Sequence, residues 1–227
     1  MLTGSTKVMT TSWRTDLFRW LAQISRHAPR GRFRLASLFL NLASTSSATP
    51  SIYGPWLQSK WHDLTFRFCV TGYYGHYLSD FLRTISHPYS FVDIGANYGI
   101  YSLVAAGNSN CKNCYAFEPN ANVFDALKTN VKLNNATQLQ AFNVAISDRT
   151  GLFPFAASEA HSGAGGLSTE LHSGHVVATR DKEFFDKIES VDKLSKVVKI
   201  DVEGHEPVVI HELMKSAMWK NVRHLYF

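Results

Sequence analysis

The sequence predicts an α/β fold in which a mostly parallel sheet carries helices on both faces. From residue 91 onward, short apolar runs of strand length alternate with segments whose apolar residues recur at helical spacing. Parallel strands need such crossover helices between them. Strands are expected at 91–94, 115–118, 139–144, 197–201 and 222–227. Helices are expected to start at Tyr98, to span 123–133 and to lie near 207–219.

The composition is that of a globular protein able to bury its own core. Of the 227 residues, 45% are hydrophobic and 18% are charged. The three cysteines, Cys69, Cys111 and Cys114, cannot all pair with one another, so a disulfide framework is not expected. A reducing compartment, most simply the cytoplasm, is the expected location.

The positive charge of the chain is concentrated in its first fifty residues. Residues 51–227 are nearly neutral, with 16 basic and 17 acidic residues. Residues 1–50 hold one acidic residue, Asp16, against seven basic ones: Lys7, Arg14, Arg19, Arg26, Arg30, Arg32 and Arg34. This segment fits either a solvated helix face or contact with an anionic surface, such as a membrane or a phosphorylated substrate. Its Arg- and Ser-rich, acid-poor composition also leaves an organelle transit peptide open.

The chain divides into a basic helical segment with its linker at 1–50 and a larger domain at 51–227. The small polar residues of 43–50 predict the linker, and alternating apolar residues predict a strand at 64–70. A short helix is expected at 78–85 and a substrate-facing loop in the Gly/Ser/His-rich stretch 158–174. Because the sequence ends inside an apparent strand, further C-terminal strands are expected to be missing.

A glycine-containing turn joins the first main strand to its helix, in the sequence Asp93-Ile-Gly95-Ala-Asn97-Tyr-Gly99. Open parallel sheets bind ligands at the carboxyl ends of their strands, which is where this turn falls. Gly95 permits a tight turn and close backbone approach, and Gly99 permits tight packing of the helix. Asp93 could accept from an ammonium group or orient the turn. A ligand with both charges of an amino acid suits this site.

An acidic residue, Glu118, ends the next strand in the sequence Phe117-Glu118-Pro119. At that position a carboxylate can hold the two hydroxyls of a ribose, and its distance from the turn suits one strand–helix–strand unit. A generic nucleotide-binding fold with an incidental Glu is the alternative.

Acidic residues and a histidine cluster after the strand at 197–201, in the sequence Lys199-Ile-Asp201-Val-Glu203-Gly204-His205-Glu206. Asp201, Glu203 and His205 are candidate catalytic residues, since such groups can orient a hydroxyl, abstract its proton or bind a divalent metal. The alternative is that Glu203 and Glu206 only begin the next helix, where negative charge is favourable.

Together, FVDIGANYGIYS, AFEP, AISD at 145–148 and KIDVEGHE resemble the FkbM-type methyltransferases over about residues 60–227. The resemblance implies a Rossmann-like methyltransferase fold, S-adenosylmethionine as cofactor and methyl transfer to a hydroxyl oxygen of a sugar or another small metabolite. It also implies cofactor contacts at Asp93, Gly95, Asn97, Gly99 and Glu118, which we extend to the neighbours Ala96 and Pro119.

Two other functional hypotheses belong to different classes. A catalytically impaired cofactor-binding or interaction protein would suit the basic N-terminal segment and the missing strands. A nicotinamide-dependent oxidoreductase is disfavoured because Asn97 stands where the dinucleotide fingerprint needs its second glycine. No basic-aromatic motif predicts a nucleic-acid partner. Zinc at Cys111 and Cys114 is disfavoured because no second metal-ligand pair has the required spacing, and the oligomeric state stays open.

Overall fold

A computed structural model describes residues 47–158, 160–167 and 176–227. The expected N-terminal helices and the first half of the linker at 43–50 lie outside these residues. Within them, no helix is long and apolar enough to cross a membrane.

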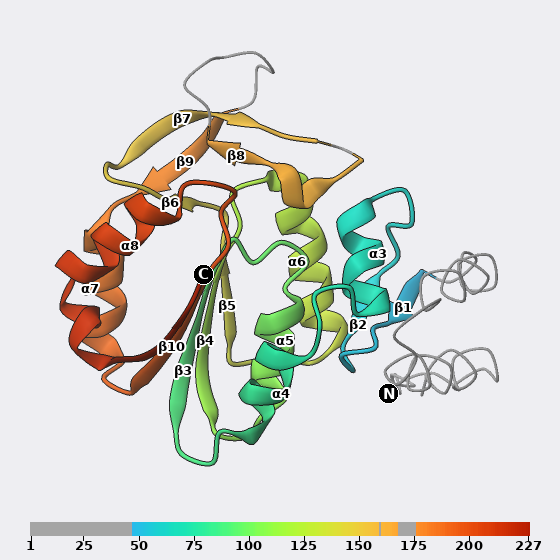
Figure 1. Cartoon of the computed structure of the whole chain (residues 1–227), viewed down its shortest axis with the longest axis horizontal. Helices are drawn as coiled ribbons and strands as arrows, with labels where there is room; N and C mark the ends of the chain where they lie inside the picture. Colours follow the sequence, from blue (N-terminus) through green and yellow to red (C-terminus); the bar gives the residue numbers. More distant parts are fainter. Residues whose placement is uncertain (1–46, 159, 168–175) are drawn as a thin grey trace, which may run out of the picture.

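The centre of the fold is a five-stranded parallel sheet in the order β11-β10-β3-β4-β5 (Figure 1). Its strands are β3 (Tyr89–Ile94), β4 (Cys111–Phe117), β5 (Leu139–Phe142), β10 (Ser195–Ile200) and β11 (Val222–Tyr226). The five strands expected from the sequence are all present, with ends shifted by up to four residues. The strand order reverses between β3 and β10, so the two halves of the sheet diverge there and leave a crevice at the carboxyl ends.

Helices cover both faces of the sheet, as the sequence predicts (Figure 1). Phe91 and Val197 project from the strands into the core beneath α4, α5 and α6, whereas Val92 and Val198 project into the core beneath α7 and α8. This alternation makes every strand apolar on both faces. The helices are α4 (Tyr77–Thr84), α5 (Ile100–Ala106), α6 (Ala121–Leu133), α7 (Lys182–Val191) and α8 (Glu206–Lys215), the last followed by the 3₁₀ segment η2 (Ala217–Asn221).

The strand expected at 64–70 is wrong, because this segment forms helix α3 (Leu64–Thr71). The apolar residues at every second position mimic a strand. The buried positions are instead Thr65, Phe66, Cys69 and Val70, which is a helical repeat. Gly72 then ends the helix in the left-handed conformation with φ +79°.

The buried carboxylate of Asp63 fixes the start of α3. One oxygen accepts from the backbone N–H groups of Thr65 and Phe66 at 2.7 and 3.4 Å. The other accepts from the hydroxyl of Tyr98 at 2.8 Å, in the turn that follows β3. Asp63 therefore joins α3 to the carboxyl end of the central sheet.

Asp63→Ala should cost about 2–4 kcal/mol of unfolding free energy, because it removes a helix cap and leaves the buried Tyr98 hydroxyl without this partner. Urea denaturation measures this loss. Asn120→Ala is the control, since Asn120 caps α6 through one bond to the N–H of Asn122 and should cost only about 1 kcal/mol. Equal losses in the two variants would show that the bond to Tyr98 adds nothing.

A smaller sheet in the order β6-β9-β7-β8 lies above the carboxyl ends of the central strands (Figure 1). Its strands are β6 (Ala145–Ile146), β7 (Gly151–Ala156), β8 (Gly166–Leu167) and β9 (Val176–Arg180). The sequence interpretation missed β7, β9 and α7. Of the loop expected at 158–174, the described part holds the 3₁₀ turn η1 (Ser162–Ala164) and β8.

The last three residues of the expected linker are a strand. β1 (Ala48–Pro50) is fully buried and pairs antiparallel with β2 (Trp56–Gln58). α6 holds β2 in place, since Asn130 and Asn134 accept from the N–H groups of Gln58 and Trp56 at 2.6 and 2.8 Å. Residues 48–50 thus belong to the folded domain.

Candidate functional site

A pocket opens at the carboxyl end of the central sheet, at the point where the strand order reverses. The turns after β3, β4 and β10 form its floor, while α3, residues 144–146, Phe155 and residues 161–167 form its walls. The empty space, including the open mouth, is about 960 Å³.

Gly95 stands where β3 and β10 come closest, and its role differs from the expected one. A Cβ added to Gly95 would lie 1.8 Å from the carbonyl oxygen of Asp201, and the φ of Gly95 is +78°. The N–H of Asp201 in turn donates to the carbonyl of Ile94 at 3.0 Å. Gly95 lines the pocket, but the close approach that requires glycine is to the backbone of the neighbouring strand.

Asp93 lies beneath the turn and does not line the pocket. It is fully buried, and its carboxylate accepts from the Ser102 hydroxyl at 2.6 Å and from the Lys199 ammonium at 3.1 Å. Lys199 also donates to the carbonyl of Gly95 at 3.2 Å. Burial alone would lower the pKa of Lys199, but the carboxylates of Asp93 and Asp201 raise it above its usual value. Asp93 thus accepts from an ammonium group of the protein itself and orients the turn.

Ala96 and Gly99 also lie away from the pocket lining. Ala96 packs in the core, and Gly99 begins α5 with φ +79°. A Cβ at Gly99 would lie 2.3 Å from Leu127 of α6, so this glycine permits two helices to meet, whereas the expectation was a helix against a strand. Asn97 does line the pocket, and its side-chain amide donates to the Ser162 hydroxyl at 3.2 Å.

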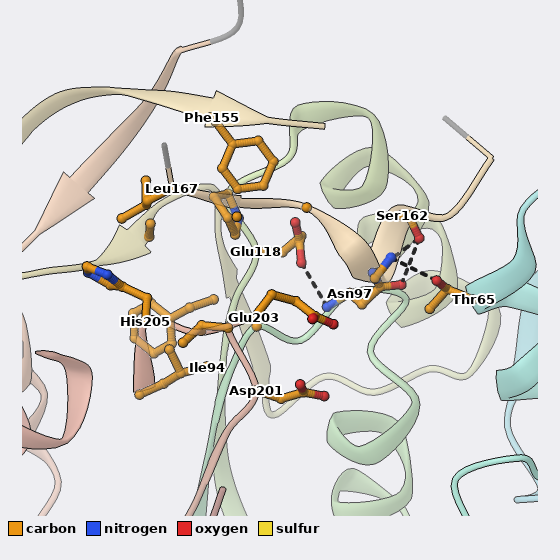
Figure 2. Close-up of a pocket in the computed structure, with 18 of the residues that line it drawn as sticks. Thr65, Ile94, Asn97, Glu118, Phe155, Ser162, Leu167, Asp201, Glu203 and His205 are labelled. Atoms are coloured by element: carbon orange, nitrogen blue, oxygen red, sulfur yellow. Dashed lines mark hydrogen bonds between the residues drawn. The ribbon is translucent and has the colours of Figure 1, made fainter. Parts of the chain in front are cut away.

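Glu118 is the buried acidic group of the site, beside Pro119 in the pocket lining. One carboxylate oxygen accepts from the N–H of Asn97 at 2.9 Å (Figure 2). The other accepts from the N–H of Asn120 at 2.8 Å. Burial raises the pKa of Glu118 to about 7, although these two hydrogen bonds act in the opposite direction. The carboxyl group can therefore change its charge near neutral pH.

If Glu118 holds the cofactor ribose, cofactor affinity should rise with pH. The ionised carboxylate accepts from hydroxyls better than the protonated form, so affinity is fully present above pH 7 and is lost below it. Calorimetry with S-adenosylhomocysteine should show roughly tenfold weaker binding at pH 6 than at pH 8. Glu118→Gln cannot titrate and should bind weakly with no such slope. An unchanged slope in this variant would assign the titration to another group.

The same raised pKa has a consequence for the stability of the free protein. Between pH 4.5 and about 7 the folded chain holds the Glu118 proton that the unfolded chain releases. Its contribution to stability is therefore present at low pH and lost as the pH rises through about 7.

The three candidate catalytic residues line the pocket but separate into two places. Figure 2 shows the carboxylates of Asp201 and Glu203 on the same side of the pocket as Asn97, and the His205 ring at the opposite end. The Asp201 side chain is 59% exposed and lies 3.6 Å from the Lys199 ammonium. His205 lies 3.0 Å from the Ser147 hydroxyl.

The environments of Glu203 and His205 suit proton transfer. Burial raises the pKa of Glu203, and the charges of Asp201 and Glu206 add to this effect. Burial lowers the pKa of His205, so its imidazole is neutral at pH 7. Glu203 is also a non-glycine residue with φ +54°, and strained backbone of this kind concentrates at functional sites. Glu206 instead accepts from the N–H groups of Val202 and Gly204 at 2.9 Å each, as expected for a residue that begins a helix.

Several pocket residues were missed from the sequence. Thr65 lies on α3, and its hydroxyl accepts from the N–H of Gly163 at 2.8 Å. Phe155 and Leu167 lie on the smaller sheet. The incorrect strand at 64–70 and the unrecognised small sheet hid them. The motif at 145–148 was the available signal for Ser147.

The described residues contain no group of three or more His, Cys, Asp or Glu side chains that could hold a metal ion. Cys111 and Cys114 are both buried as free thiols. The divalent metal considered from the sequence therefore stays a hypothesis.

The pocket combines a buried carboxylate with an apolar wall, groups that suit the ribose hydroxyls and the flat base of a nucleoside-type cofactor. Glu118 is the carboxylate, and the side chains of Val144, Ile146 and Phe155 supply the wall. With the crevice at the reversal of strand order, these features define a Rossmann-like cofactor-binding domain.

The methyltransferase FkbM domain matches residues 93–223, which is more than half of the chain. The chain therefore belongs to the FkbM family of S-adenosylmethionine-dependent methyltransferases. No curated protein matches it.

Solved structures with partial similarity are methyltransferases of other kinds. The tRNA m1G37 methyltransferase of M. jannaschii is 18% identical with a TM-score of 0.32, over 47% of this chain and 35% of that one. M. jannaschii TYW2 in complex with AdoMet is 17% identical with a TM-score of 0.31, over 47% of this chain and 53% of that one. Precorrin-6y C5,15-methyltransferase from Geobacter metallireducens GS-15 is 11% identical with a TM-score of 0.35, over 64% and 55%. The chain thus spans between about a third and just over half of their lengths, and the similarity says nothing about its acceptor.

Proposed function

We propose that this methyltransferase acts on a hydroxyl oxygen of a sugar or another small metabolite. The observation that carries the proposal is the pair of carboxylates, Asp201 and Glu203, on the side of the pocket that also holds Asn97. Hydroxyl groups donate hydrogen bonds to carboxylates, and a weakly acidic hydroxyl needs a proton acceptor as it becomes a nucleophile.

One set of pocket residues would bind the cofactor, and another would activate the acceptor hydroxyl. Gly95, Asn97 and Glu118 would hold S-adenosylmethionine, which supplies an activated methyl group on its sulfonium sulfur. Asp201 or Glu203 would take the proton of the acceptor hydroxyl, which makes its oxygen a better nucleophile toward that methyl group. The remaining catalytic contribution is alignment of the acceptor oxygen with the methyl group.

His205 is the alternative proton acceptor, because it is neutral at pH 7 and lines the same pocket. Its contact with Ser147 and its place at the other end of the pocket favour a role in holding the cofactor. We therefore expect His205→Ala to weaken binding of S-adenosylhomocysteine more than it lowers kcat. The reverse result would make His205 the base.

The experiment that tests the proposal measures methyl transfer from isotope-labelled S-adenosylmethionine to a panel of alcohols, amines and thiols. Glycosides and small alcohols should be methylated at oxygen, which mass spectrometry of the products identifies. Transfer confined to nitrogen or sulfur acceptors would refute the assignment. Cofactor binding without any transfer across the panel would favour the binding-protein hypothesis.

A further inference from the structure

Phe68, Tyr74 and His161 line the pocket, and Tyr73 stacks on Phe68. We call these four residues the aromatic wall. The Phe68 ring stacks on Tyr73 with centroids 4.0 Å apart and an interplanar angle of 15°. Tyr74 and His161 meet Phe68 edge-on, with centroids 6.0 and 6.1 Å away. Three of these residues precede the matched range 93–223.

The aromatic wall faces solvent and is continuous with the site. Tyr73 is 50% exposed and Tyr74 is 41% exposed. Phe68, Tyr74 and His161 line the same pocket as the catalytic carboxylates. Large aromatic rings that stay exposed next to a pocket are typical of binding surfaces, since they offer an apolar face with a polar tip.

The aromatic wall and the two carboxylates share one pocket. Phe68, Tyr74 and His161 line it together with Asp201 and Glu203. Burial raises the pKa of Tyr74, so its ring carries no charge at neutral pH. An acceptor bound in this pocket can therefore contact an uncharged tyrosine ring and a carboxylate at the same time.

The fold holds the wall in place without a ligand. Gly72 ends α3, and the N–H groups of Gly72 and Tyr73 both donate to the carbonyl of Phe68, at 3.1 and 3.2 Å. Gly75 closes the following turn through its N–H bond to the carbonyl of Gly72 at 3.1 Å. The other end of α3 is fixed by Asp63. A preformed surface loses little conformational entropy when a ligand binds.

We infer that the aromatic wall is the acceptor subsite and that it selects a ring-shaped acceptor with an apolar C–H face and hydroxyls on its edge, such as a pyranoside. The inference rests on the proposed O-methyl transfer. The negative π face of an aromatic ring attracts a C–H face, while Asp201 and Glu203 accept from edge hydroxyls. The two carboxylates would repel an anionic acceptor, and a linear polyol has no continuous apolar face.

Binding of methyl β-glucopyranoside to the full chain saturated with S-adenosylhomocysteine tests the subsite without turnover. Saturation-transfer NMR should show transfer to the ring C–H protons in the wild type. Tyr74→Ala and Tyr74→Leu, which remove the π face, should abolish the signal, whereas Tyr74→Phe should keep it. The control is Tyr77→Ala, which removes a tyrosine that is 79% exposed outside the wall. A signal that persists in Tyr74→Ala and Tyr74→Leu overturns the inference.

Two further readouts separate this inference from its alternatives. In Tyr74→Leu, the affinity for S-adenosylhomocysteine should stay within about twofold of that of the wild type. If the affinities for S-adenosylhomocysteine and for the pyranoside fall equally, the wall holds the cofactor. Choline, a hydroxylated cation, should bind more weakly than the pyranoside, and Tyr74-dependent preference for choline would make the wall a cation site.

Kinetics distinguish failure of the subsite from failure of the proposed function. With a pyranoside acceptor, Tyr74→Leu should raise KM about tenfold and change kcat less. If the wild type binds the pyranoside through Tyr74 but methylates only amines or thiols, the subsite stands and the proposed O-methyl transfer fails. If the wild type methylates pyranosides with a KM that Tyr74→Leu leaves unchanged, the subsite fails and the proposed function stands.

Discussion

Gly95→Ala is expected to prevent stable folding, because it should lower the free energy of unfolding by about 4 kcal/mol or more. The added Cβ would overlap the Asp201 carbonyl oxygen at 1.8 Å, and backbone atoms at the junction of two central strands cannot rotate away as a side chain can. The positive φ of Gly95 adds strain of its own. Chemical denaturation followed by circular dichroism measures the loss.

Gly204→Ala is the matched control for this prediction. Gly204 lies in the turn after β10 and has φ +95°, but an added Cβ would meet no atom within 4 Å. Gly204→Ala should lower the free energy of unfolding by about 1–2 kcal/mol, through backbone strain alone. If Gly95→Ala is no more destabilising than Gly204→Ala, β3 and β10 do not approach as closely as the structure shows.

Asp201→Asn and Glu203→Gln are expected to lower kcat by about a hundredfold to ten-thousandfold for the residue that takes the proton. Both changes keep the shape of the side chain and remove its ability to accept a proton. The Kd of S-adenosylhomocysteine should change little, because the loss falls on the chemical step. Single-turnover kinetics with an identified acceptor, together with calorimetry, provides both measurements.

The control for these variants is Asp80→Asn on α4. The Asp80 side chain is 57% exposed and pairs with Arg83 at 3.1 Å, so it matches Asp201 in exposure but lies outside the pocket. The kcat of Asp80→Asn should equal that of the wild type. If both Asp201→Asn and Glu203→Gln also turn over normally, the catalytic role of the carboxylates is refuted.

The central sheet could be predicted from the sequence because its strands are apolar on both faces. Runs such as Phe91–Ile94 are short, buried and bounded by turn residues, so little besides a parallel strand suits them. The segment 64–70 was harder, since its alternation of apolar residues outweighed the helix signals of Asp63 and Gly72 at its ends. β7 and β9 were missed because their partly exposed residues give no strong apolar period.

The sequence placed several candidate site residues at one edge of the sheet, but it did not predict their contacts. Turn and strand-end motifs placed Asn97, Glu118 and Asp201 at one edge of the sheet, and all three line the pocket. Sequence could not show that Asp93 is satisfied by Lys199, a residue 106 positions away. Nor could it show that Gly95 and Gly99 make room for protein atoms. Such roles depend on which strands become neighbours.

The placement of α3 has a consequence for how this molecule can diversify. The aromatic wall is encoded mainly by 68–74, ahead of the matched range 93–223, whereas Asn97 and Glu118, the proposed cofactor contacts, lie inside it. Mutations in the short early segment can alter which molecule is accepted while the strands that hold the cofactor keep their sequence. Because Asp63 fixes α3 from outside the wall, the exposed rings are free to vary without loss of the scaffold. If the wall is the acceptor subsite, its preference among ring-shaped acceptors can change by mutation outside the matched range.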